Sequence, residues 1–249
     1  MKKLIAIALA AMLAPAWGAE VVSSNIVGYQ KLDLRNGFTI VGSQFLNVGA
    51  DTKDIQELVA SDTDMVGLDA NLNFQTELRV WSGTGYDIYG WDSEGDPEVA
   101  GSDHKWVNGD LQVMAFDIPV GEAVWIKSPA AASITLSGEV PEGTTQSQEI
   151  KVGFNLIANP FPVATSVQDI QLSDEIPGLD ENLNFQTELR VWSGTGYDIY
   201  GWDSEGDPEV AGSDHKWVNG DLQVVDVTIP MGQGFWIKST TAGTVTFKK

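Results

Sequence analysis

The sequence of 249 residues contains no cysteine, only 14 lysines and arginines, and only two histidines. Without cysteine the chain has no disulfide framework, no thiolate zinc site and no cysteine nucleophile. The 35 aspartates and glutamates give a formal net charge of -21. A chain this acidic repels phosphate backbones, so we expect no nucleic-acid partner. Hydrophobic residues make up 43% of the chain, too many for a disordered acidic tail, and this predicts a packed core.

The chain also lacks a hydrophobic run of the roughly 18 residues that a membrane-spanning helix needs. Its first apolar run, residues 4–13, follows two lysines and precedes several small residues, which is the layout of a secretory signal peptide. We therefore predict a signal peptide over residues 1–19, with the mature chain starting between Trp17 and Glu20. The mature protein, without a transmembrane segment, is then expected at the cell surface, outside the cell or in the periplasm of a bacterium. The alternative is an N-terminal anchor that stays uncleaved.

One long segment occurs twice. Residues 67–113 recur as residues 178–224 at an offset of 111, and among these 47 positions only Ala70 and Glu181 differ. The match extends more weakly on both sides, so the repeat unit has about 100 residues, the size of an independently cored domain. We predict a first module within residues 20–140 and a second within 141–249. The near-identity of the central segment indicates either a function carried in both copies or a recent duplication, and both interpretations remain open.

Short alternating segments between glycine, proline and asparagine predict strands. Residues 153–161 alternate before a turn-forming Asn-Pro pair, and a hairpin is predicted over residues 77–89. Further strands are predicted over residues 25–34, 111–118, 123–127 and 133–136, and helical turns only over 51–60 and 166–171. The strand at 25–34 is expected to join the sheet of the first module. We predict an all-β fold of two tandem β-sandwich or β-barrel-like modules, each with one short helix.

Two motifs of the second module carry a resemblance. GFNLIANPF at residues 153–161 and PMGQGFWIK at residues 230–238 resemble segments of β-rich modules in exported, surface-associated bacterial proteins, notably of the Verrucomicrobia and Lentisphaerae. The resemblance implies an extracellular or envelope β protein and supplies no catalytic residues. The first module departs from these motifs at residues 43–44 and 122–124, which predicts that its site is altered or degraded.

An acidic loop is present in both copies. Its carboxylates stand at alternate positions, and calcium takes six to eight oxygen ligands of this kind from a tight loop. Pro97 occupies the position where an EF-hand requires glycine, so the loop is not an EF-hand. Calcium is nevertheless the candidate cofactor, and the alternative is a solvated acidic loop. The candidate calcium ligands are Asp92, Glu94, Asp96, Glu98 and Asp103, with their counterparts Asp203, Glu205, Asp207, Glu209 and Asp214.

Aromatic residues are abundant, with nine tryptophans in the chain. Flat rings beside carboxylates and amides suit carbohydrates, whose apolar faces stack on rings while their hydroxyls form hydrogen bonds. Trp81 and Trp125 stand among apolar neighbours and are expected in the core. The aromatic residues that flank the acidic loops are the candidate ligand-binding residues: Tyr89, Trp91 and Trp106 in the first module, and Tyr200, Trp202 and Trp217 in the second.

Each module has one histidine, His104 or His215, directly after an aspartate. Because adjacent residues of an extended chain point to opposite faces, Asp103 is not expected to orient His104. We predict no catalytic residues and no enzyme activity. The predicted function is that of an exported acidic surface or matrix protein acting in adhesion or self-assembly, with polysaccharide, other surface components or its own copies as partners. The alternatives are a tandem carbohydrate-binding module, in which two sites raise avidity, and then a glycan-active enzyme.

Overall fold

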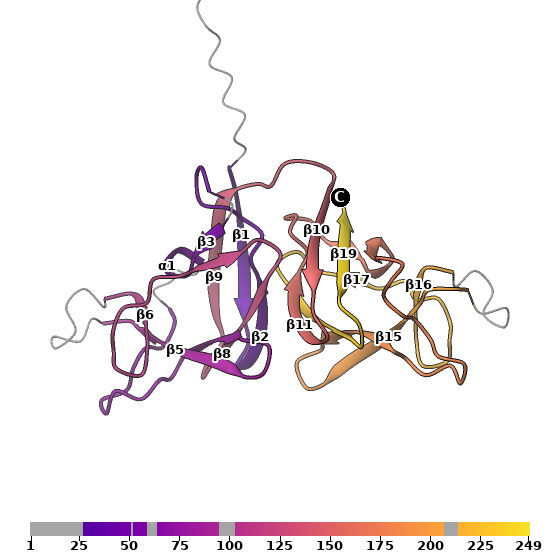
Figure 1. The fold of residues 1–249 in the computed structure, drawn as a ribbon. Helices are drawn as coiled ribbons and strands as arrows, with labels where there is room; N and C mark the ends of the chain where they lie inside the picture. Colours follow the sequence, from indigo (N-terminus) through magenta and orange to yellow (C-terminus); the bar gives the residue numbers. More distant parts are fainter. Residues whose placement is uncertain (1–26, 51, 59–63, 95–102, 207–213) are drawn as a thin grey trace, which may run out of the picture.

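The structure, a computed structural model, describes residues 27–50, 52–58, 64–94, 103–206 and 214–249. Strands dominate these residues, which confirms the predicted all-β fold. They form two similar modules that lie side by side (Figure 1). All sheets in the described part are antiparallel, and none of them closes into a barrel. The predicted signal peptide at 1–19 lies outside the described residues.

The elements of the first module lie between residues 27 and 139. They are β1 (Val27–Leu34), β2 (Gly37–Gly42), β3 (Thr52–Asp54), α1 (Ile55–Leu58), β4 (Glu77–Trp81), β5 (Tyr86–Asp92), β6 (Lys105–Val107), β7 (Asp117–Pro119), β8 (Ala123–Ser128) and β9 (Ala132–Glu139). A five-stranded sheet has the order β2-β8-β4-β5-β6, and two further sheets pair β1 with β9 and β3 with β7. The strand expected near residues 25–34 is therefore β1, and its partner is β9 along its whole length.

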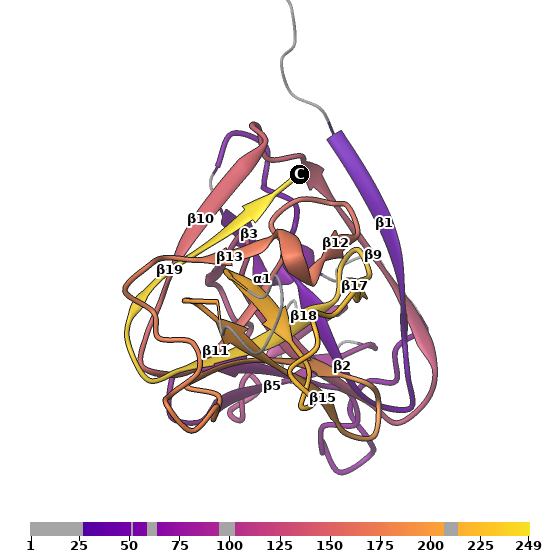
Figure 2. The same cartoon turned by 90° about the vertical axis from the view of Figure 1, so that its right-hand side faces the viewer.

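The second module repeats this arrangement. Its elements are β10 (Thr145–Ile150), β11 (Gly153–Ala158), β12 (Thr165–Ser166), η1 (Val167–Asp169), β13 (Ile170–Leu172), β14 (Thr187–Trp192), β15 (Tyr197–Asp203), β16 (Lys216–Val218), β17 (Thr228–Ile229), β18 (Gly234–Ser239) and β19 (Gly243–Lys248). The five-stranded sheet is β11-β18-β14-β15-β16, beside the sheets β10-β19-β13 and β12-β17. In Figure 2 these smaller sheets lie above the strands β11, β18 and β15, and the core of the module fills the space between them.

Helical structure in the described residues is limited to single turns, as predicted. The α-helix α1 covers only four of the ten positions expected at 51–60, and three of those positions, 51, 59 and 60, lie outside the described residues. The second module has the 3-10 turn η1, which begins after Ser166, whose hydroxyl accepts a hydrogen bond from the backbone nitrogen of Gln168. Ile55 and Leu58 of α1 and Val167 of η1 are buried, so these turns close the cores of their modules.

Each five-stranded sheet is buried on one face by its own module and, around β8 or β18, on the other face by the neighbouring module. In β8, Val124 and Ile126 belong to the core of the first module, while the alternating residues Ala123 and Trp125 belong to a separate cluster that is shared with the second module. The same alternation occurs in β18, where Phe235 and Ile237 face inward and Trp236 faces the first module. The outer faces of the two sheets therefore pack against each other and form a third apolar cluster.

The strand predicted over residues 111–118 is much shorter than expected. Asn108 Oδ1 accepts hydrogen bonds from the backbone nitrogens of Asp110 and Gln112, each at 2.9 Å, and this forms a tight loop. Leu111 lies in that loop with a φ of 59°, a left-handed conformation that no strand contains. Regular pairing therefore begins only at β7, residue 117. Because leucine is unusual at positive φ, the sequence gives no sign of this loop, and the apolar pattern of the segment indicates a strand instead.

Candidate functional site

The four tryptophans predicted to bind a ligand are buried in the cores of the modules. Their exposed fractions are 0% for Trp91 and Trp106, 1% for Trp202 and 0% for Trp217. Trp91 pairs with Trp106 across β5 and β6, and Trp202 pairs with Trp217 across β15 and β16, with ring centroids 5.1 Å apart in both pairs. Rings enclosed in this way offer no free face to a sugar, so the prediction is wrong for these four residues.

The two tyrosines of the same prediction are partly buried and support the cores. The ring of Tyr89 lies 5.1 Å from that of Phe116, and Tyr200 packs against the core of the second module. Burial raises the pKa of both phenols, with a smaller contribution from the neighbouring aspartates 87 and 198. Their rings therefore complete the apolar packing and do not form a binding surface with the tryptophans.

The acidic loops are described only in part. Asp92 and Asp203 are buried, and their Oδ1 atoms accept hydrogen bonds from the backbone nitrogens of Glu94 at 3.3 Å and of Gly206 at 3.0 Å. The side chains of Glu94, Glu205, Asp103 and Asp214 are exposed. In the described part of the chain no three metal-binding side chains form a cluster. Asp96, Glu98, Asp207 and Glu209 lie outside the described residues, so calcium binding stays a prediction.

The structure corrects the expectation for the histidines. Asp103 Oδ1 lies 2.5 Å from His104 Nδ1, and Asp214 makes the same contact with His215. This is possible because the chain is not extended there: the φ angles of His104 and His215 are 53° and 52°. The ring of His104 also meets Trp91 edge-on, with centroids 6.1 Å apart. The histidine thus joins the loop to the buried tryptophan pair.

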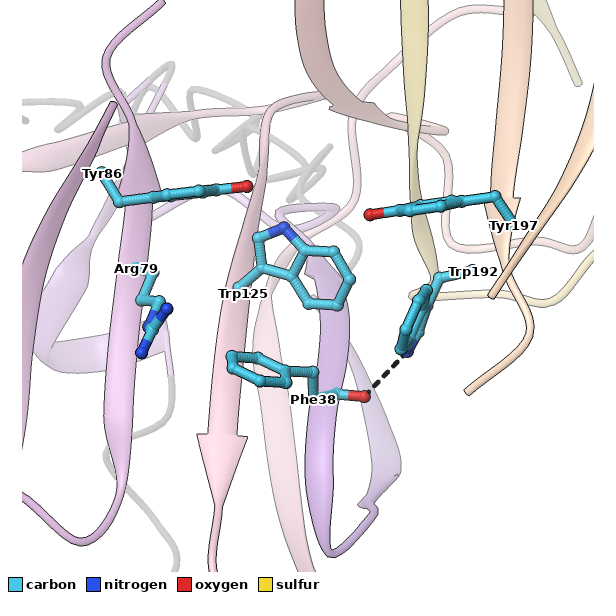
Figure 3. A pocket seen from close by; sticks show the side chains of 6 residues that line it. All are labelled: Phe38, Arg79, Tyr86, Trp125, Trp192 and Tyr197. Carbon is cyan, nitrogen blue, oxygen red and sulfur yellow. Dashed lines mark hydrogen bonds between the residues drawn. The ribbon is translucent and has the colours of Figure 1, made fainter. Parts of the chain in front are cut away.

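A pocket of about 230 Å³ lies between the two modules (Figure 3). Aromatic side chains from both modules form most of its wall, and one guanidinium completes it. None of these residues belongs to the acidic loops. The lining residues are Phe38, Arg79, Tyr86 and Trp125 of the first module, and Trp192 and Tyr197 of the second.

The tryptophans at this junction pack in two equivalent pairs. Trp125 meets Trp192 edge-on with centroids 5.4 Å apart, and Trp81 meets Trp236 in the same way at 5.3 Å. The indole nitrogen of Trp192 donates to the carbonyl of Phe38 at 3.0 Å (Figure 3). In the same way the indole nitrogen of Trp81 donates to the carbonyl of Phe154 at 2.8 Å. The junction is therefore held by aromatic packing and by hydrogen bonds on both sides.

Two tyrosines supply hydroxyl groups to the pocket. Tyr86 and Tyr197 are each 38% exposed, and their hydroxyls point toward each other across the junction (Figure 3). Burial raises the pKa of both phenols, so they are neutral at pH 7 and can donate as well as accept hydrogen bonds. Trp236 Nε1 donates to the hydroxyl of Tyr197 at 3.2 Å. The buried Trp125 Nε1 lies toward Tyr86 but makes no hydrogen bond of normal geometry in the described structure.

Arg79 is held against the wall of the pocket by a neighbouring carboxylate. Its Nε and Nη2 atoms lie 2.9 and 2.5 Å from Glu77 Oε2, and its guanidinium carbon lies 5.0 Å from the centre of the Phe38 ring. Lys127 Nζ lies 2.5 Å from Glu77 Oε1. Burial acts to raise the pKa of Glu77, but the hydrogen bonds and charges of Lys127 and Arg79 outweigh it and leave this pKa below its ordinary value. Glu77 thus fixes the guanidinium of Arg79 in place and compensates its positive charge.

The departures of the first module from the second also lie at the junction. Gln44 is buried, and its side-chain nitrogen donates to the carbonyls of Asn159 and Phe161, each at 3.1 Å. Gly121 accepts a hydrogen bond from the backbone nitrogen of Ala158 at 2.7 Å. Among the residues that differ between the modules, Gln44, Glu122 and Ala123 thus contact the second module or pack in the shared cluster. That the first module has an altered or degraded site stays a prediction.

The sequence contains one signal that identifies the pocket residues. In β4, Leu78 is buried in the core of the first module, whereas Arg79 and Trp81 occupy positions whose side chains lead to the junction. Residues two apart on a strand share a face, so an arginine and a tryptophan on one face indicate a surface that is partly buried and contacts another part of the protein.

In the described residues no helix is long and apolar enough to cross a membrane. The chain matches no protein-family model, no curated protein and no solved structure.

Proposed function

We propose that the protein is an exported surface or matrix protein that adheres by binding a neutral sugar residue of a polysaccharide in the pocket between its modules. The observation that carries the proposal is the lining of the pocket. Aromatic rings from both modules stand there beside two phenol hydroxyls and a fixed guanidinium. Sugars present apolar C–H faces and hydroxyl groups together, and this combination of rings and hydrogen-bonding groups suits both.

Size and charge narrow the class of ligand. A pocket of about 230 Å³ is smaller than the range of roughly 300–1,000 Å³ typical of sites for drug-sized molecules. It has room for one ring, with the rest of a polymer outside. The net charge of -21 disfavours acidic polysaccharides, and the charge of Arg79 is compensated by Glu77. A neutral hexose unit therefore fits the site better than a uronic acid.

Binding is favoured over hydrolysis of the sugar. Glycoside hydrolysis generally uses two carboxyl groups that flank the bond to be cleaved, about 5–10 Å apart. The six residues that line the pocket include no aspartate or glutamate. The adjacent Glu77 is bonded to Arg79 and Lys127, and its lowered pKa makes it a poor proton donor at neutral pH. We therefore propose a binding protein and no enzyme.

The variant Tyr197→Ala is expected to weaken retention on a neutral polysaccharide by about tenfold or more, because it removes an aromatic wall of the pocket and a hydroxyl. Affinity electrophoresis of the mature protein in gels that contain neutral glucans, mannans or xylans measures the effect. Tyr29→Ala is the matched control, since Tyr29 is 81% exposed and lies on β1, outside the pocket. Equal retention of the wild type and both variants on a polysaccharide that binds would contradict the proposal.

Self-assembly, the other function predicted from the sequence, gives a different result in a direct experiment. Filaments or ordered arrays of the purified mature protein under the electron microscope, with no retention on any neutral polysaccharide, would favour assembly and count against sugar binding. A monodisperse protein that is retained on a polysaccharide would favour adhesion through the pocket.

A further inference from the structure

The two modules meet through equivalent surfaces that are related by an approximate two-fold axis. Val41 bridges to Gln233, and the equivalent pair Glu122 and Ile157 makes the same bridge. The backbone nitrogen of Gly42 donates to the carbonyl of Gly232 at 2.8 Å. The equivalent nitrogen of the second module, that of Ala158, donates to the carbonyl of Gly121 at 2.7 Å. In a contact of this kind a residue near the axis meets its own counterpart from the other module.

At one such position the counterparts are a glycine and an alanine. Gly42 of β2 faces Ala158 of β11, and a Cβ atom added to Gly42 would lie 2.3 Å from the Cβ of Ala158. An alanine Cβ is fixed to the backbone, so no change of rotamer relieves such a contact. Two first modules would bring glycine against glycine here, which is permitted. Two second modules would bring alanine against alanine, which the spacing excludes.

A second position has the opposite arrangement. Gly234 of β18 faces Ala123 of β8, and a Cβ atom at Gly234 would lie 2.4 Å from the Cβ of Ala123 and 2.5 Å from Cγ2 of Ile40. The counterpart of Ile40 in the second module is Leu156, which is not branched at Cβ. Two first modules would therefore place Ala123 against another alanine and against an isoleucine branch. At this position the first module is the one that excludes its own kind.

The polar contacts at the junction are also unequal. Gln44, which is buried, donates from its side chain to two backbone carbonyls of the second module, those of residues 159 and 161. Its counterpart is Pro160, which has no donor to return. Two second modules would leave these carbonyls without this donor, and buried acceptors without a donor are costly.

We infer that the face between the modules is selective: a first module pairs with a second module and rejects another first module, and a second module likewise rejects its own kind. Each like pair meets one alanine contact that the backbone spacing forbids, and only the unlike pair avoids both. The partner that this face fits is the opposite module, in the same chain or in a second copy of it. The sequence differences between the flanking segments of the two modules thus determine which modules join.

The first test measures coupling between two substitutions in the full chain. Gly42→Ala is expected to lower the melting temperature by about 3–10 °C, because overpacking forces the backbones apart. In the background of Ala158→Gly the same substitution is expected to change it by less than about 2 °C. The matched control is Gly85→Ala, where an added Cβ meets no atom within 4 Å. An equal loss in both backgrounds, or no loss in either, would overturn the inference.

The second test makes the two faces alike. A triple variant converts the face of the first module into that of the second by the exchanges Ile40→Leu, Gly42→Ala and Ala123→Gly. We expect it to have a lower melting temperature and a larger radius of gyration in X-ray scattering, since like modules separate. A sixfold variant adds the reciprocal exchanges in the second module, Leu156→Ile, Ala158→Gly and Gly234→Ala, and should restore both values. A sixfold variant that is as unstable as the sum of the two triple variants would overturn the inference.

Discussion

Replacing Trp202 by alanine is expected to lower the free energy of unfolding by about 3–5 kcal/mol. The side chain is 1% exposed and packs against Trp217, with the two ring centroids 5.1 Å apart. Truncation removes the largest type of side chain from the core of the second module and leaves a cavity that the flanking strands cannot fill. The equivalent substitution Trp91→Ala is expected to have a similar effect on the first module, because its environment is almost the same.

Urea unfolding followed by circular dichroism measures this loss. The control is Tyr29→Ala, which truncates an aromatic residue that is 81% exposed and is expected to change stability by less than about 0.5 kcal/mol. The folded fraction of Trp202→Ala should keep its retention on a polysaccharide, since the ring lies away from the pocket. Full stability together with lost retention would instead show that the ring is a ligand-binding surface, as the sequence suggested.

The burial of Trp91 and Trp202 shows which features of the fold can be predicted from the sequence. Alternation in the strands predicts which residues share a face, and it gave the all-β fold and the strand β1. It does not tell which face meets solvent, because the second face of each five-stranded sheet is partly covered by the other module, around β8 and β18. The pattern therefore predicts Trp91 at a ligand-binding surface, although it is buried. Trp125 is buried as predicted, but in the cluster between the modules, where it also lines the pocket.

Local backbone geometry accounts for another part of the difference. The contact between Asp103 and His104 depends on a positive φ at the histidine, and nothing in the local sequence requires it. The role of Gln44 depends on the carbonyls of residues 159 and 161, more than a hundred positions away in the chain. Interactions of this kind become visible only when the packing of the two modules is known.

The substitution Glu77→Gln is expected to lower the free energy of unfolding at pH 7 by about 1.5–3 kcal/mol. Glu77 lies in β4, opposite Lys127 of β8, and its side chain is 12% exposed. It accepts charged hydrogen bonds from both Lys127 and Arg79, and glutamine loses the charge that strengthens them. The equivalent substitution Glu188→Gln should act alike, because Lys238 and Arg190 contact it in the same way.

The effect of Glu77→Gln should also depend on pH, with a definite sign. The pKa of Glu77 is lower in the folded protein than its ordinary value near 4.3, so the unfolded chain binds the proton more readily. The stabilisation by this carboxylate is thus complete above that ordinary value and is lost as the pH falls through the folded pKa.

Urea unfolding of the wild type and the variant at pH 7 and at about pH 3 should therefore give a difference that shrinks in acid. Glu142→Gln is the control, because the side chain of Glu142 is exposed and lies outside the ion pairs of Glu77. If the difference in the free energy of unfolding between the wild type and the variant stays constant with pH, the charge of Glu77 does not stabilise the pairing of β4 with β8. The same variant frees Arg79 from its fixed position over Phe38, so weaker retention on the polysaccharide should accompany the loss of stability.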